Sequence, residues 1–187
     1  MLDTPAHLQD AKHLLSDQGF ATSNVWYHGT SSALVDAILQ HGLKRSGDQA
    51  LNQAAEQTMA TIGNAFEATV EPVYLTQSRE LAYFWAEQAV RNRSVRVGGD
   101  NQAAVLQATL PDALNAQVRP DVGAATLLMV DAGERYMAYV AQLYQANGLT
   151  VPDIDLKSAD RMAYLHLLGM AYLDADIPAD CLELVTP

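Results

Sequence analysis

Short β-prone runs alternate with helical patterns along this chain, and that alternation restricts the fold it can adopt. Clusters of β-branched and aromatic residues, or alternating polarity, predict strands over residues 25–28, 72–76, 103–110 and 181–185. Apolar residues at helical spacing, with hydroxyl caps and glycine stops, predict helices over 5–19, 32–41 and from Ser78 onward. The mixed order predicts one α+β domain over residues 1–187, with a helical insertion over about 124–170.

The size of the chain fits this prediction. With 187 residues, 49% of them hydrophobic, it is long enough to bury the core of one globular domain. No apolar run approaches the roughly 18 residues of a membrane span, so no membrane partner is expected. The single cysteine excludes an internal disulfide, and the first residues do not read as a signal peptide. We therefore expect a cytoplasmic protein, or one exported without a conventional signal.

The charge balance is strongly acidic. The chain carries 22 acidic against 11 basic residues, for a net charge of −11. Proteins that neutralise nucleic-acid phosphates carry basic faces, so we expect no non-specific nucleic-acid binding. The one basic cluster, Arg91, Arg93 and Arg96, is interpreted as a solvated loop.

One segment combines a strand with residues suited to a nicotinamide-ribose site. Residues 25–30 read Val-Trp-Tyr-His-Gly-Thr, and the strand is expected to turn at Gly29. His28 would donate a hydrogen bond to a ribose hydroxyl, and Gly29 would let the backbone approach a carboxamide. Thr30 would hold the loop or contact the ribose. Alone, this triplet predicts little more than a strand followed by a turn.

Three further motifs follow in order. The next helix closes on Ile-Leu-Gln-His-Gly-Leu over 38–43, residues 73–76 read Val-Tyr-Leu-Thr, and Ser-Arg-Glu-Leu-Ala-Tyr opens a helix over 78–83. With His-Gly-Thr, this order resembles the diphtheria-toxin-like ADP-ribosyltransferase clade. That clade contains the poly(ADP-ribose) polymerases, the rifamycin ADP-ribosyltransferases and, more distantly, the RNA 2′-phosphotransferases. The resemblance covers residues 23–121 and 174–186 and is nearest in character to the rifamycin enzymes.

The resemblance implies a fold and a site. The fold would be a split β-sheet core with flanking helices. NAD⁺ would be the co-substrate: His28 would bind its nicotinamide-side ribose and the backbone of Gly29 its carboxamide. Tyr74 and Tyr83 would sandwich the nicotinamide ring, and Ser78 would contact the amide. No metal is implied.

The acid that completes such a site has two main candidates. Asp121 resembles the aspartate that follows the middle strand in the rifamycin enzymes, and Glu183 lies on the last predicted strand. Asp174 is a third, weaker candidate. The polymerase-type glutamate would fall near Ala171 or Tyr172, where the sequence has no acid, so we favour Asp121 over Glu183.

The resemblance implies a mono-ADP-ribosyltransferase, a glycosyltransferase of toxin or effector type. Its acceptor would be a protein, a nucleic acid or a small molecule. One alternative is an RNA 2′-phosphotransferase-like enzyme, although the arginines that would hold a phosphate are missing around the opening helix. Another is a catalytically degenerate domain that binds NAD⁺, ADP-ribose or a protein partner.

Overall fold

The computed structural model describes residues 15–16, 19–20, 23–67, 70–121, 141, 144–145, 148–151 and 170–185. Residues 5–14 of the first predicted helix lie outside these ranges. The predicted helical insertion over about 124–170 lies almost entirely outside them as well.

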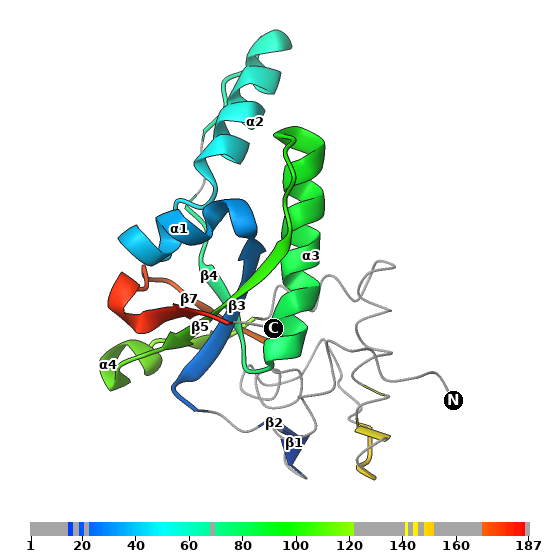
Figure 1. The fold of residues 1–187 in the computed structure, drawn as a ribbon, viewed down its shortest axis with the longest axis vertical. Helices are drawn as coiled ribbons and strands as arrows, with labels where there is room; N and C mark the ends of the chain where they lie inside the picture. The colour runs from blue at the N-terminus through cyan, green and yellow to red at the C-terminus, as the bar shows by residue number, and fades with distance from the viewer. Residues whose placement is uncertain are drawn as a thin grey trace.

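An antiparallel sheet of six strands forms the centre of the described structure (Figure 1). Its order is β6-β7-β4-β3-β5-β8, so β4 and β3 are the two middle strands. The strands are β3 (Val25–Ser31), β4 (Val73–Thr76), β5 (Ala103–Thr109), β6 (Arg119–Pro120), β7 (Met170–Leu173) and β8 (Leu182–Leu184). With the helices beside it, this sheet confirms the predicted α+β class.

The described helices include the two that were predicted over 32–41 and from Ser78 onward. They are α1 (Ser32–His41), α2 (Gln49–Thr61), α3 (Arg79–Arg96), the short α4 (Asp112–Asn115) and a 3₁₀ turn, η3 (Ala179–Cys181). Ser31 caps α1 by accepting from the N–H of Ala33, and Ser78 caps α3 by accepting from that of Leu81. α1 stops at Gly42, whose φ of 84° suits glycine.

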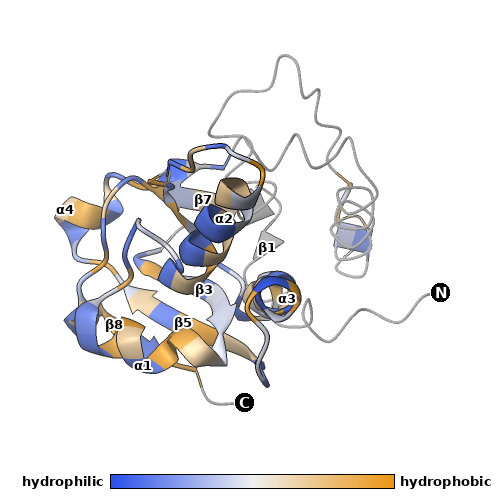
Figure 2. Ribbon diagram, turned by 90° about the horizontal axis from the view of Figure 1, so that it is seen from above, coloured by the Kyte–Doolittle hydropathy of each residue, from blue (hydrophilic) through white to orange (hydrophobic). Residues whose placement is uncertain are grey.

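Different helices cover the two faces of the sheet. α3 lies along β3 and β5 on one face, and Figure 2 looks nearly along its axis. On the other face Trp26, Leu75 and Leu106 pack with Ile38 of α1 in the main hydrophobic core. Because side chains alternate along a strand, odd-numbered residues of β3 face α3 and even-numbered residues face the main core.

α3 approaches β3 most closely at Gly29. A Cβ at this position would lie 2.1 Å from the backbone oxygen of Ala82 and 2.6 Å from the nitrogen of Ala86. Ala82 and Ala86 are fully buried, so small residues on both elements let the two backbones touch. A side chain at position 29 would push α3 off the sheet.

We therefore expect Gly29→Ala to lower the free energy of unfolding by about 3 kcal/mol, the upper end for overpacking. Gly63→Ala is the control, because Gly63 has a φ of +78° but nothing within 4 Å of an added Cβ. It should cost only about 1 kcal/mol, from its left-handed backbone. Urea unfolding measures both, and equal losses would contradict the close packing.

Several predictions about local structure were wrong. β3 does not turn at Gly29, because it stays paired with β5 as far as Ser31. The end of the helix predicted over 5–19 is instead a strand pair, β1 (Leu15–Ser16) with β2 (Gly19–Phe20). β7 was not predicted at all: the helical insertion was expected to end at about residue 170, and residues 171–173 were assigned to no element.

The buried face of α3 also differs from expectation. The spacing of Leu81, Phe84, Trp85 and Ala89 predicts one buried apolar face, but Leu81 alone of these four is fully buried. The alanines that touch β3 lie on the inner face instead. In the part of the chain that the structure describes, no helix is both long and apolar enough to cross a bilayer.

Candidate functional site

The two middle strands of the sheet, β3 and β4, are joined by a single backbone pair. Tyr27 lies opposite Thr76, and the antiparallel pairing does not extend to the next position, where Gly29 would face Tyr74. β3 pairs with β5 over seven positions and β4 pairs with β7 over four. The pairing of β3 with β4 is therefore the weakest in the sheet, and the two strands separate beside His28. We call this place, between residues 28–29 of β3 and Tyr74 of β4, the opened junction.

The imidazole of His28 holds this junction. Its Nδ1 lies 2.9 Å from the backbone oxygen of Tyr74. A carbonyl only accepts, so this contact requires the proton on Nδ1 and leaves the lone pair of Nε2 as an acceptor. Burial lowers the pKa of His28 from its ordinary value of 6.5, against a smaller opposite effect of the bond to Tyr74.

His28 is consequently a neutral imidazole near neutral pH. The prediction that it donates to a ribose hydroxyl needs correction, because its one N–H is engaged by Tyr74. A hydroxyl would instead donate to Nε2. The residue assignment is unchanged, but the direction of the hydrogen bond is reversed.

The peptide groups of Gly29 face the opened junction. The backbone oxygen of Asn24 accepts from the N–H of Leu110, and the backbone N–H of Ser32 donates to the backbone oxygen of Gln102. These bonds place the peptide groups of even-numbered residues toward β5 and those of odd-numbered residues, Gly29 included, toward β4. Since the β3–β4 pairing ends before Gly29, at least one polar group of this residue lacks its strand partner. Gly29 is only partly buried.

Tyr74 lies on the same face of the sheet as α3. Thr76 pairs with Tyr27, which faces α3, and Tyr74 is two residues before Thr76 on the same strand. The side chain of Tyr74 therefore faces α3 as well, and the residue is 48% exposed. Tyr83 comes from α3 and is partly buried against Ala82 and Ala86. The two tyrosines thus lie on the side where Gly29 meets α3.

Ser78 and Thr30 are both buried. Ser78 is 1% exposed and its hydroxyl accepts from the N–H of Leu81, 3.0 Å away, so it holds the start of α3. Thr30 is 4% exposed and, by alternation, lies on the face of the main core. A contact of either residue with a ligand stays a prediction.

The two main acid candidates lie at opposite edges of the sheet. Asp121 follows the edge strand β6, and its N–H donates to the oxygen of Met170 at 3.1 Å. Glu183 lies on the other edge strand, β8, where its carboxylate accepts from the amide of Gln107. Asp174 pairs with Arg45 at 3.1 Å. Of the two main candidates, Asp121 lies on the Tyr74 side of the opened junction and Glu183 on the other side.

The electrostatics of Tyr74 agree with this placement. The pKa of its phenol is raised, first by desolvation and then by the negative charges of Glu71 and Asp121. Tyr74 therefore stays protonated through the physiological range. Asp121 is therefore close enough to Tyr74 to act on the pKa of its phenol.

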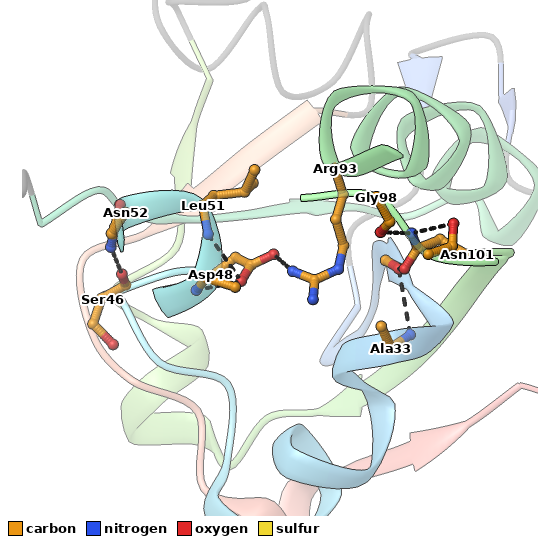
Figure 3. A network of polar contacts seen from close by, with 11 residues as sticks. Ala33, Ser46, Asp48, Leu51, Asn52, Arg93, Gly98 and Asn101 are labelled. Carbon is orange, nitrogen blue, oxygen red and sulfur yellow. Dashed lines mark hydrogen bonds and ion pairs between the residues drawn. The ribbon is translucent and has the colours of Figure 1, made fainter. Parts of the chain in front are cut away.

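A buried ion pair fixes the far end of α3. Arg93 reaches from α3 to Asp48, whose other oxygen caps α2 by accepting from the N–H groups of Ala50 and Leu51 (Figure 3). The side chains of Asp48 and Arg93 are only 9% and 13% exposed. Arg93 was interpreted as part of a solvated loop, and that was wrong: it lies in a helix and pairs with an acid.

Removing one charge of this pair should be costly. Asp48→Asn keeps an N-cap for α2 but leaves Arg93 without a counter-charge, so we expect a loss of about 3 kcal/mol in the free energy of unfolding. Lys44→Gln is the control, because the Lys44–Asp176 pair is 48% exposed on both sides. Its loss should stay below about 1 kcal/mol. Thermal or urea unfolding compares the two, and similar losses would refute a stabilising Asp48–Arg93 pair.

A shallow hollow lies away from these residues. It is lined by four residues of α2 and by Phe66, namely Gln49, Asn52, Gln53, Glu56 and Phe66. No residue of the opened junction contributes to it. Apart from Glu56, its polar lining consists of uncharged amides, and none of the residues predicted for the site lies there, so we assign the chemistry to the junction instead.

Sequence patterns missed Tyr172. The register of β4 and β7 places Tyr172 directly opposite Tyr74, on the same face of the sheet. Met-Ala-Tyr-Leu is short and apolar, and such a run does not distinguish a strand from the end of a buried helix. Its position two residues before the acidic turn at Asp174 was the only available signal.

No family model, curated protein or solved structure matches this chain. The functional inference therefore rests on the residues and their geometry.

The neutral state of His28 is open to direct measurement. Because burial disfavours the imidazolium, we expect its NMR titration midpoint in the folded protein to lie below the ordinary 6.5. As the pH falls below 6.5, the unfolded chain takes up this proton before the folded one does, so the folded state loses stability.

His28→Asn provides the control, since its amide can still donate to the Tyr74 carbonyl but does not titrate. This part of the acid-dependent loss should be absent in the variant. A folded-state midpoint at or above 6.5 would overturn the assignment of a neutral ring.

Proposed function

We propose that this chain is an NAD⁺-dependent mono-ADP-ribosyltransferase, which breaks the bond between nicotinamide and ribose. One observation carries the proposal: the opened end of the β3–β4 pairing, where the peptide groups of Gly29 face β4. A carboxamide has the same donor and acceptor groups as a peptide, so it can pair with an exposed strand edge. The adjoining His28 and Tyr74 suit the ribose and the ring of nicotinamide.

The roles of these residues follow from their chemistry. Tyr74 and Tyr83 flank the flat nicotinamide ring on the α3 side of the sheet. By alternation His28 lies on the other face of the sheet, so its Nε2 atom accepts a hydrogen bond from a ribose hydroxyl across the opened β3–β4 junction and fixes the sugar relative to the ring. Ser78 holds the start of α3, which carries Tyr83. Holding both halves of the scissile bond favours the geometry in which it breaks.

Bond cleavage leaves positive charge on the ribose. Nicotinamide departs with the electron pair of the C–N bond, and the sugar acquires oxocarbenium character. Asp121 lies on the Tyr74 side and supplies a carboxylate that stabilises this charge or orients the acceptor. Glu183 is engaged by Gln107 on the far edge strand, which supports Asp121 as the acid.

The finer fold assignment is part of the same proposal. An ADP-ribosyltransferase-like core has a sheet split around its ligand. The single pair between Tyr27 and Thr76 supports such a split, because strands joined at one position separate beyond it. The resemblance of the motifs around His28, Tyr74 and Ser78 supports the same fold.

The matched acids test the mechanism. We expect Asp121→Asn to slow the release of nicotinamide from NAD⁺ about a hundredfold, as loss of one electrostatic contact to a transition state does. Glu183→Gln, with the same change of charge, should retain the wild-type rate. Release is followed by chromatography, and NAD⁺ binding by thermal shift. Equal rates for the two variants would exclude Asp121 as the acid.

A second function has one observation in its favour. The strand beside Tyr74, β7, carries no acid among residues 170–173, and Asp121 lies beyond it at β6. A domain that binds NAD⁺ or ADP-ribose without transferring it would need no acid there. Saturable NAD⁺ binding without nicotinamide release, in the wild-type chain, would favour this second function.

A further inference from the structure

Tyr74 and Tyr172 are two tyrosines that lie side by side on the α3 side of the sheet. They stand directly opposite each other in β4 and β7, and side chains at such positions lie about 5 Å apart at their Cβ atoms. Tyr74 is 48% exposed and Tyr172 is partly exposed, so neither ring is closed off. We name these two residues the tyrosine platform. It extends from the opened junction toward the edge strand β6.

The surroundings of the platform are negatively charged. Glu71 precedes β4 and Asp121 follows β6, and both carboxylates raise the pKa of Tyr74. Arg119 is opposite Tyr172 in β6, but its Nη1 donates to the backbone oxygens of Ala116 and Val118. Its guanidinium is therefore held at the turn after α4. Glu71 and Asp121 thus add to the effect of desolvation in raising the pKa of the Tyr74 phenol.

A cation is the complementary ligand for such a surface. Aromatic faces attract cations, and a guanidinium also stacks flat on a tyrosine ring. Its planar set of N–H groups matches carboxylate oxygens, whereas an ammonium is a compact point charge that keeps its water. Charge and shape thus both favour a guanidinium over an amine.

We propose that the tyrosine platform, flanked by Glu71 and Asp121, is the acceptor subsite and takes an alkylguanidinium group such as an arginine side chain. This inference rests on the proposed function, since it places the acceptor beside the ring that flanks nicotinamide. The nitrogen of the guanidinium forms a bond to the anomeric carbon of the ribose. The C–N bond to nicotinamide breaks, nicotinamide leaves neutral with the electron pair, and the guanidinium proton passes to Asp121.

Agmatine, a small alkylguanidine, provides the probe. The full chain is incubated with NAD⁺ and agmatine, and the products are identified by mass spectrometry while nicotinamide release is followed in parallel. 1,5-Diaminopentane, which carries an ammonium in place of the guanidinium, is the matched probe. We expect an ADP-ribosyl adduct of agmatine and at least about tenfold less adduct of the diamine.

Two variants test the role of the platform. Tyr172→Ala should raise the KM for agmatine about tenfold, and Tyr172→Phe, which keeps the ring, should restore it. Val95→Ala is the control, because Val95 is 82% exposed on α3. Its KM for agmatine should equal that of the wild type.

The outcomes separate the two proposals. Nicotinamide release without an agmatine adduct would overturn the acceptor assignment and leave the proposed function standing. Equal labelling of agmatine and the diamine, or an unchanged KM in Tyr172→Ala, would also overturn it. Absence of release from NAD⁺ would overturn the proposed function, and the acceptor assignment with it.

Discussion

The hydrogen bond from His28 to the backbone oxygen of Tyr74 is the contact on which the candidate site depends. In a continuous antiparallel pairing this oxygen would accept from the N–H of Gly29, but here it accepts from the imidazole. The bond ties β3 to β4 where their backbone pairing stops. It also fixes which ring nitrogen carries the proton, so one interaction sets both the opening in the sheet and the chemistry of His28.

The close contact between α3 and Gly29 complements this bond. The absence of a side chain lets the backbone of Ala82 reach β3, which brings Tyr83 to the side of the sheet where Tyr74 lies. α3 is held at its start by the Ser78 cap and near its end by the Arg93–Asp48 pair. The helix is therefore fixed near both ends beside the opened junction. Gly29 thus has two roles. Its lack of a side chain lets α3 pack closely against β3, and its peptide groups face the opened junction.

The sequence predicted the elements that depend on local signals and missed those that depend on partners. Hydroxyl caps at Ser31 and Ser78 and the β-prone runs located α1, α3, β3 and β4, because capping and alternation are short-range effects. β7 was missed because a short apolar run becomes a strand only by pairing with β4. His28, Gly29 and Tyr74 were predicted as neighbours, but the tautomer of His28 could not be, since it depends on the oxygen of a residue 46 positions away.

Binding of nicotinamide to the edge of β3 is the central claim, and the backbone amide of Gly29 tests it most directly. In a ¹⁵N-labelled chain titrated with NAD⁺, the Gly29 amide signal should shift in a saturable manner, together with the ring signals of Tyr74. ADP-ribose, which lacks nicotinamide, should leave the Gly29 signal in place. A Gly29 signal that stays unmoved at saturating NAD⁺, or that moves equally with ADP-ribose, would contradict the claim.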